Sequence, residues 1–167
     1  MKSEICWIPG ESGERLGIMA RPRGGDWLED EIRVWLNAGA HVVVSVLEPA
    51  EVSELELEAE QSLCFRIGLD FISFPIPDRG IPDSRSGMVQ LVRRLRSVII
   101  NGKHVAIHCR QGIGRSSMVA ASVLLSLGAN GNNVFNIIAG ARGCSVPDTP
   151  QQVSYALSLQ FEEFGTW

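Results

Sequence analysis

The stretch HVAIHCRQGIGRSSMVAASVLLSLG, residues 104–128, joins two apolar runs through a glycine-rich turn. The first run is short and rich in β-branched residues, which predicts a buried strand. The second is longer and ends in glycine, which predicts a helix. The turn contains Cys109, Gly112 and Gly114, and Arg115 opens the helix. The sequence therefore predicts a strand, a loop and a helix in direct succession, with a thiol where the loop begins and a guanidinium where it ends.

Runs of strand type and runs of helix type alternate through the rest of the chain. Strands are expected at 41–47, 69–76 and 104–109, with shorter strands within 6–25, and helices at 26–39, 51–68, 88–102, 115–128, 133–143 and 149–164. This alternation is typical of a mostly parallel central sheet flanked by helices on both faces. Ligands bind beyond the carboxyl ends of such strands, where the polar loops 77–83 and 109–114 are expected to meet.

The composition excludes several classes of protein. The 167 residues suit one domain, 1–167, and the net charge of −4 disfavours a general nucleic-acid binder. No apolar run approaches the ~18 residues of a membrane helix, and the first residues lack the apolar core of a signal peptide, so a cytoplasmic location is expected. The four cysteines form no C-x-x-C pair, which disfavours a structural zinc site and predicts free thiols.

The quoted loop offers the groups that bind a phosphate. Backbone N–H groups in a glycine-containing turn can point inward together, and the following helix adds the positive end of its dipole. Gly112 and Gly114 permit a crowded or left-handed backbone, and Arg115 supplies a planar fork for two phosphate oxygens. The same positive surroundings favour the nucleophilic thiolate of Cys109. We therefore expect displacement at phosphorus, followed by hydrolysis of a cysteinyl phosphate.

Neighbouring residues suggest supporting roles. Ser116 can hydrogen-bond the thiolate as it leaves in the second step, and His108 can orient the loop through its backbone, although a buried histidine with no such role is the alternative. No metal and no cofactor are expected, because Arg115 and the loop N–H groups supply the stabilisation that Mg²⁺ supplies elsewhere. The loop is neither a Walker A loop, which needs Gly-Lys-Ser/Thr, nor a dinucleotide fingerprint, which needs a third glycine.

The stretch HCRQGIGRSS, residues 108–117, resembles the signature loop of the cysteine-dependent protein tyrosine phosphatases. The short chain resembles their compact dual-specificity branch, and FPIPDRGIPD and RGCSVPDTPQQVSYAL are most similar to kinase-associated-phosphatase and Cdc-fourteen-like members. The resemblance implies a hydrolase for phosphotyrosine in proteins, and for phosphoserine and phosphothreonine where the pocket is shallow. It implies a monomer inhibited by phosphate, vanadate or tungstate. The phosphate-binding residues that it implies are Arg110, Gln111, Gly112, Ile113, Gly114 and Arg115.

The reaction also needs a general acid and a positioned water. The candidates for the acid are Asp78 and Asp83. The resemblance favours Asp78, in PDRGIP, whereas Asp83 also suits the start of the following helix. For the water, the resemblance indicates Gln152, with Gln151 as the alternative. Pro147 and Asp148 depart from the family pattern here, and this departure leaves the choice of glutamine open.

Several alternatives stay open at this point. The first is a phosphatase for phosphoinositides, inositol phosphates or other small phosphoesters, although the loop's variable positions carry one basic residue, Arg110. The second is a catalytically weak phosphopeptide-binding module, and a rhodanese-like enzyme is disfavoured by the acid loop. A redox disulfide from Cys109 to Cys64 or Cys144 is a further hypothesis, with core packing as its alternative. Glu48, at a strand end, is expected to hold loop backbone or an arginine.

Overall fold

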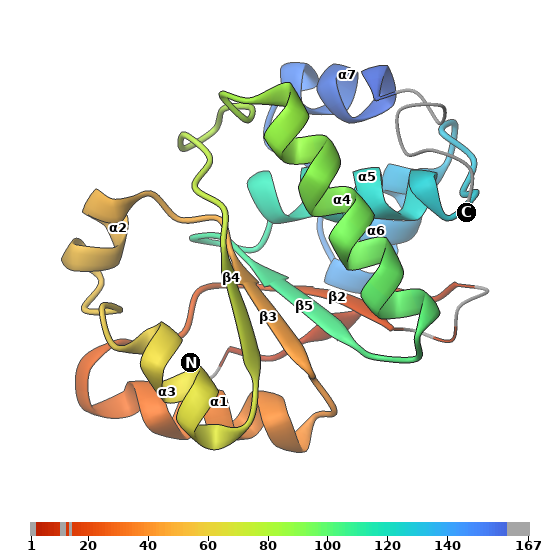
Figure 1. Ribbon diagram of the computed structural model, residues 1–167. Coiled ribbons are helices and arrows are strands. Elements are labelled where there is room, and N and C mark those ends of the chain that lie inside the picture. Colours follow the sequence, from red (N-terminus) through yellow and green to blue (C-terminus); the bar gives the residue numbers. More distant parts are fainter. Residues whose placement is uncertain (1–2, 11–12, 14, 160–167) are drawn as a thin grey trace.

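The computed structural model describes residues 3–10, 13 and 15–159, and its centre is a twisted sheet with helices on both faces (Figure 1). The strands are β1 (Cys6–Trp7), β2 (Leu16–Met19), β3 (Val42–Ser45), β4 (Asp70–Ser73) and β5 (Val105–His108). In the described residues the strand order is β1-β2-β5-β3-β4. β1 is antiparallel to β2, and the other neighbours are parallel. The predicted, mostly parallel sheet between two helical layers is confirmed.

The helices form two unequal layers. On one face of the sheet lie α1 (Leu28–Asn37), after a short 3-10 helix η1 (Gly25–Trp27), and α3 (Glu60–Ile67). On the other lie α4 (Arg85–Ile100), α5 (Arg115–Ser126), α6 (Val134–Arg142) and α7 (Pro150–Ser158). The short helix α2 (Pro49–Glu54) follows β3 and stands apart from both layers (Figure 1). None of the helices in the described ranges has both the length and the apolarity needed to cross a bilayer.

Two helix predictions need correction. The helix expected over 51–68 is split into α2 and α3, because the chain leaves the helical conformation after Glu54 and Glu56 takes a left-handed φ of 55°. The helix expected over 149–164 runs over Pro150–Ser158, and residues 160–164 lie outside the described residues. In the loop before α4, the residue that caps the helix is Ser84, whose hydroxyl accepts from Gly87 N–H, and not Asp83.

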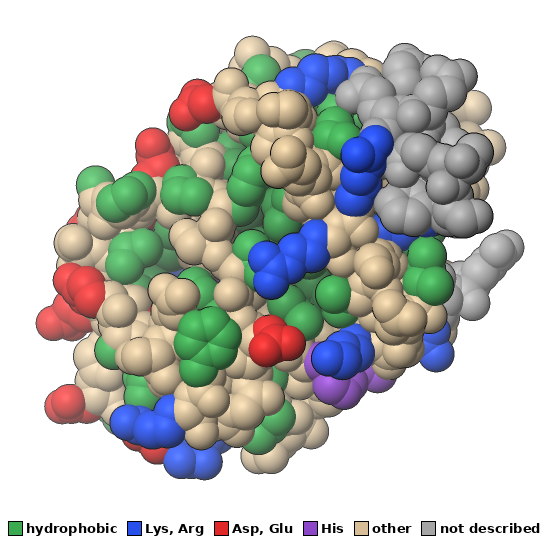
Figure 2. All heavy atoms as spheres, in the orientation of Figure 1, with side chains coloured by type: hydrophobic (Ala, Val, Ile, Leu, Met, Phe, Trp, Pro, Cys, Tyr) green, Lys and Arg blue, Asp and Glu red, His purple; other side chains and the backbone are tan. Residues whose placement is uncertain are grey.

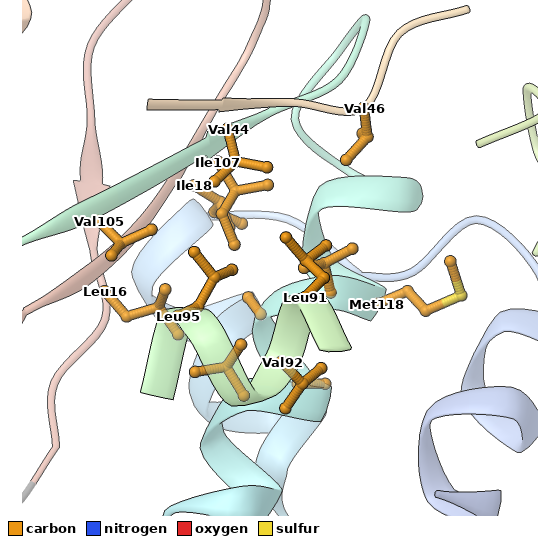
Figure 3. Close-up of a cluster of buried hydrophobic side chains, with 14 of the residues drawn as sticks. Leu16, Ile18, Val44, Val46, Leu91, Val92, Leu95, Val105, Ile107 and Met118 are labelled. Carbon is orange, nitrogen blue, oxygen red and sulfur yellow. The ribbon is translucent and has the colours of Figure 1, made fainter. Parts of the chain in front are cut away.

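Alternation along the strands divides the core between the two layers. Val42 and Val44 of β3 face α4 and α5, whereas Val43 between them faces α1 and α3. Figure 3 shows the larger cluster, in which Val44 and Ile107 of the sheet pack against α4. Both layers of helix are therefore fixed to the sheet by buried aliphatic side chains.

The register brings the strand ends to a single edge. His108 of β5 pairs with Ser45 of β3 and with Met19 of β2, so the chain leaves all three strands at the same level. The loop after β4 leaves at this edge too, since Ser73 pairs with Ser45. In Figure 1 this edge carries the β5–α5 loop, the loop that leads to α4 and helix α2. The ligand-binding edge expected of such sheets is therefore built from these segments.

Charged side chains are unevenly distributed on the molecular surface. In Figure 2 several basic side chains lie over and beside α4 and others lie at the lower left, whereas acidic side chains lie mainly along the left margin, over α2 and the neighbouring loops. The solvent face of α4 is thus basic, while its buried face, which includes Val92 and Leu95, packs on the sheet. The carboxylates over α2 lie close to the ligand-binding edge, where they can pair with arginines of the site.

Candidate active site

The loop between β5 and α5 is shaped by close contacts that require glycine. Gly112 has a φ of +70°, and a Cβ there would come within 2.5 Å of the Met19 backbone. A Cβ on Gly114, the N-cap residue of α5, would overlap the Asp148 carboxylate. A side chain at either position would therefore displace the loop from the sheet edge or from the segment that precedes α7.

The carbonyl groups of the loop are bonded on its outer side. Arg142 Nη2 donates to Gln111 O at 2.9 Å and its Nε to Gly112 O at 3.0 Å, while the backbone N–H of Arg21 donates to Arg110 O. In a trans peptide the C=O and N–H groups point in opposite directions, so these bonds turn the N–H groups that follow toward the inside of the loop. The bonds therefore preorganise an anion-binding nest, and Arg142 was not found by the sequence analysis.

Cys109 lies at the floor of this nest. Its side chain is 3% exposed, and its Sγ accepts a hydrogen bond from Gly112 N–H at 3.2 Å. Ser116 Oγ lies 3.2 Å from the same sulfur, the position expected for a donor to a leaving thiolate. Gly112 N–H, Ser116 Oγ and the amino end of α5 thus converge on the sulfur.

His108 joins the loop to the other helical layer. The ring is fully buried: Nε2 lies 2.6 Å from Glu60 Oε1, and Nδ1 lies 3.4 Å from Cys109 O. The second contact joins the ring to the backbone of the loop, and the loop-orienting role of His108 stays a prediction. Glu60, on α3, lies 48 residues away in the sequence and was not predicted as a partner of His108.

Arg115 is a buried cation held by carboxylates. Its side chain is 2% exposed, and Nη1 and Nη2 donate to the two Glu51 oxygens at 2.7 and 2.8 Å, while Nη1 also donates to Ile76 O. Burial acts to lower the pKa of Arg115, but the hydrogen bonds and charge of Glu51, with the charges of Cys109 and Asp78, hold it above its usual value. The guanidinium is therefore charged and fixed in one plane beside the thiol.

Asp78 reaches the same guanidinium from a tight turn. Gly80 N–H donates to Pro77 O, and Arg79 between them has a left-handed φ of 56°. The side chain of Asp78 is 58% exposed, and its Oδ1 lies 3.2 Å from Arg115 Nη2. The structure thus brings Asp78 to the thiol loop, whereas Asp83 is exposed and does not line the cavity there.

Glu48 holds the backbone of this turn. Its Oε2 accepts from Asp78 N–H at 3.4 Å, and it caps α2 in a reciprocal capping box with Glu51. The loop-holding role expected of Glu48 is therefore seen, and the same capping box positions Glu51 for Arg115. Glu51 was not predicted from the sequence, although a carboxylate three residues after an N-cap residue was the available signal.

The glutamines of α7 occupy different environments. Gln151 is exposed, whereas Gln152 is fully buried: its Nε2 donates to Gly80 O and its Oε1 accepts from Asp148 N–H, both at 3.1 Å. Gln152 thereby links the acid-bearing turn to the segment before α7. Its role in positioning water stays a prediction.

The converging residues enclose a polar cavity of about 100 Å³. The side chains and loop positions that line it are Asp78, Arg79, Cys109, Arg110, Gln111, Gly114, Arg115 and Asp148. A larger cavity of about 270 Å³ lies at the opposite end of β2, and its described lining is mainly apolar, with Ile8, Leu16 and Ile137 among its residues. The thiol of Cys109, the Arg115 guanidinium and the Asp78 carboxylate all line the smaller cavity.

The other cysteines differ from Cys109 in their surroundings. Burial and the neighbouring Glu60 raise the pKa of the Cys64 thiol to about 12, and Cys64 lies in the hydrophobic cluster beneath the opposite face of the sheet from the cluster that contains Cys109. A protonated, buried thiol is a poor partner for disulfide exchange. Cys144 is exposed and lies just after α6. A bridge from either one to Cys109 stays a hypothesis.

Glu51 is expected to contribute strongly to stability because its loss leaves a buried arginine short of a counter-charge. We expect Glu51→Gln to lower the free energy of unfolding by about 3 kcal/mol. Burial raises the pKa of Glu51, but Arg115 and the Glu48 N–H lower it by more, so the pKa of Glu51 lies below its ordinary value of 4.5. The stabilisation by Glu51 is therefore fully present above pH 4.5 and is lost as the pH falls through the lowered pKa. Urea unfolding at neutral pH measures the effect. Glu54→Gln is the matched control, since exposed Glu54 pairs with Arg110, and equal losses in both variants would contradict the assignment.

Known proteins share this sequence pattern and fold. A family model described as "Polymorphic toxin system, DSP-PTPase phosphatase" matches residues 17–129. Cyclin-dependent kinase inhibitor 3 of Rattus norvegicus is 34% identical over 163 residues, 91% of this chain and 76% of that protein. Its namesake in Sus scrofa is 30% identical over 107 residues, 63% of this chain, and the match spans only 50% of that protein's length. A crystal structure of kinase associated phosphatase, with serine in place of the catalytic-site cysteine, matches with a TM-score of 0.82 and 21% identity over 93% of each chain.

Proposed function

Because the chain belongs to the dual-specificity phosphatase family, we propose that it hydrolyses phosphate monoesters on proteins through a cysteinyl-phosphate intermediate. The single observation that carries this proposal is the meeting of a thiol, a buried guanidinium and an aspartate at one polar cavity. A thiolate attacks phosphorus, an arginine fork stabilises the equatorial oxygens, and an acid protonates the departing oxygen. Cys109, Arg115 and Asp78 have these chemistries.

The first step forms a sulfur–phosphorus bond. The Cys109 thiolate attacks the phosphorus, the bond to the substrate oxygen breaks, and Asp78 gives its proton to that oxygen as the alcohol or phenol leaves. The loop N–H groups and Arg115 bind the three remaining oxygens. In the second step water attacks the phosphorus and the Cys109 sulfur leaves as a thiolate, with Ser116 donating to it. The resemblance to the family indicates Gln152 as the residue that positions that water.

The ion pairs of Arg110 favour a phosphoprotein substrate over a polyphosphorylated inositol. This side chain is the one basic residue among the variable positions of the loop, and it pairs with Glu54 at 2.8 Å. Its Nη1 also lies 3.7 Å from Glu51 Oε1. An arginine with two carboxylate neighbours is poorly placed to bind additional phosphate groups. We also propose a monomer inhibited by phosphate, vanadate or tungstate, and a cytoplasmic location stays a prediction.

The identity of the acid is tested with paired asparagine variants. We expect Asp78→Asn to lower kcat/KM by about 10²–10⁴-fold, more for a phosphotyrosine peptide than for p-nitrophenyl phosphate, whose leaving group needs less protonation. Asp83→Asn, in the same loop but outside the cavity lining, should retain wild-type activity. Initial rates in EDTA with reductant measure both. The reverse ranking would move the acid to Asp83, and a wild type that binds tungstate without turnover would replace the enzyme with the phosphopeptide-binding alternative.

A further inference from the structure

The active-site cavity contains a second carboxylate that the proposed mechanism does not use. Asp148 lines the same cavity as Cys109, Arg115 and Asp78, but it comes from the segment between α6 and α7 rather than from the loop after β4. Its carboxylate lies against the amino end of α5, where a Cβ on Gly114 would overlap Asp148 Oδ2. The carboxylate is therefore close to the nest that binds the phosphoryl group.

A carboxylate at this place opposes the first half of the reaction. The substrate is a phosphate dianion, and a like charge at the cavity wall weakens its binding. Arg115 already has a counter-charge in Glu51, so Asp148 is not needed to balance the arginine. The position of Asp148 suits a later step, after the leaving group has departed, in which a carboxylate can accept a proton. That step is the attack of water on the cysteinyl phosphate.

The two cavity aspartates differ in what they contact. Asp78 Oδ1 lies 3.2 Å from the Arg115 guanidinium, whereas the described part of the chain offers the Asp148 carboxylate no ion pair. Asp148 is also exposed, so solvent water can reach it. An accessible carboxylate with uncommitted oxygens can accept a hydrogen bond from an incoming water.

Gln152 holds Asp148 in place rather than leaving its amide free for water. Gln152 Oε1 accepts the Asp148 backbone N–H at 3.1 Å, and Gln152 Nε2 donates to Gly80 O at 3.1 Å. The amide thus ties the turn that carries Asp78 to the segment that carries Asp148. Because Gln152 is fully buried, this link is shielded from solvent and fixes the backbone beside both carboxylates.

We propose that Asp148 is a further catalytic residue, which accepts the proton of the water that hydrolyses the cysteinyl phosphate; the proposal rests on the proposed phosphatase function. The water oxygen forms a bond to phosphorus as the phosphorus–sulfur bond breaks, and the electron pair of that bond stays on Cys109 as a thiolate. One water proton passes to Asp148, and the product is inorganic phosphate. Gln152 is a positioning residue that acts through Asp148.

The test separates the two chemical steps. With p-nitrophenyl phosphate, Asp148→Asn should lower kcat by about 10²-fold and leave kcat/KM within about threefold of the wild type, because kcat/KM reports only the steps up to release of p-nitrophenolate. Rapid mixing should then show a burst of one p-nitrophenolate per active site. Asp78→Asn should instead lower kcat/KM and show no burst, and Asp148→Glu should recover part of kcat.

Controls distinguish this proposal from simple misfolding and from the proposed function. Tungstate should bind Asp148→Asn at least as tightly as wild type, since a negative charge at the cavity is removed, and Gln151→Ala should be unaltered throughout. If Asp148→Asn does not fold, as judged by circular dichroism, Asp148→Ser is measured in its place. A parallel fall of kcat and kcat/KM without a burst, unchanged kinetics, or a loss confined to peptide substrates would overturn the role of Asp148. A wild type without turnover would instead overturn the phosphatase function.

Discussion

Replacing Cys109 by serine is expected to abolish turnover of p-nitrophenyl phosphate, with a loss on the order of 10⁶-fold, while the fold and anion binding persist. A serine hydroxyl is far less acidic than a thiol, so the nucleophilic anion is no longer formed at neutral pH. The two contacts of the sulfur, Gly112 N–H and Ser116 Oγ, can both be made by a serine oxygen. The variant should therefore bind tungstate at least as well as wild type, because the thiolate charge beneath the anion is gone.

The matched control for this variant is another cysteine of the same chain. Cys144 is exposed and lies outside the cavity lining, so Cys144→Ser should leave kcat and tungstate binding unchanged. Initial rates in EDTA with reductant, together with tungstate-dependent thermal shifts, measure both variants. If Cys109→Ser kept a tenth of wild-type activity, the covalent route would be excluded and direct attack by water would have to be considered.

The sequence predicts the loop and its place in the fold because both depend on local patterns. The β-branched run before Cys109 and the apolar run after Arg115 are continuous, and the glycine at 112 is required by a left-handed φ and by the Met19 backbone. The same local logic places Asp78 after a strand and next to a turn. Parallel strands then bring these segments to one edge of the sheet, so no tertiary contact has to be predicted to place them together.

The partners of these residues were not predictable in the same way. Arg115 and Glu51 are separated by 64 residues and His108 and Glu60 by 48, and both glutamates lie in the glutamate-rich stretch 51–60, whose composition is typical of a solvated surface. Only the folded structure, in which Arg115 reaches Glu51 and His108 reaches Glu60, shows that these two carboxylates are buried. Arg142 was missed for the same reason, since its targets are backbone carbonyls that no sequence pattern marks.

Asp148 shows a different limit of sequence reasoning. The sequence marks it as a departure from the family pattern beside the glutamines, and this departure reads as a weakness of the glutamine assignment. The structure places its carboxylate against Gly114 and shows its backbone bound to Gln152. Asp148 departs from the family pattern in the sequence, but its position in the folded chain makes it a candidate catalytic residue.

Arg115→Lys is expected to lower kcat/KM by about 10³–10⁵-fold, the range that a single transition-state arginine contributes in phosphoryl transfer. The guanidinium donates to both Glu51 oxygens and to Ile76 O at once, and this arrangement fixes its plane at the wall of the cavity. A lysine ammonium keeps the charge and can still pair with Glu51, but it cannot span these partners and also bind two phosphate oxygens.

The measurement separates geometry from charge. Arg115→Lys and Arg115→Ala should both lose activity and tungstate affinity, and the lysine variant should retain more of its stability to urea because Glu51 keeps a partner. Arg110→Lys is the control, since the Arg110 side chain is half-buried, lines the same cavity and pairs with exposed Glu54. This variant should stay within about threefold of wild type. If Arg115→Lys were as active as Arg110→Lys, a positive charge alone would be sufficient, and the planar fork would have no catalytic role.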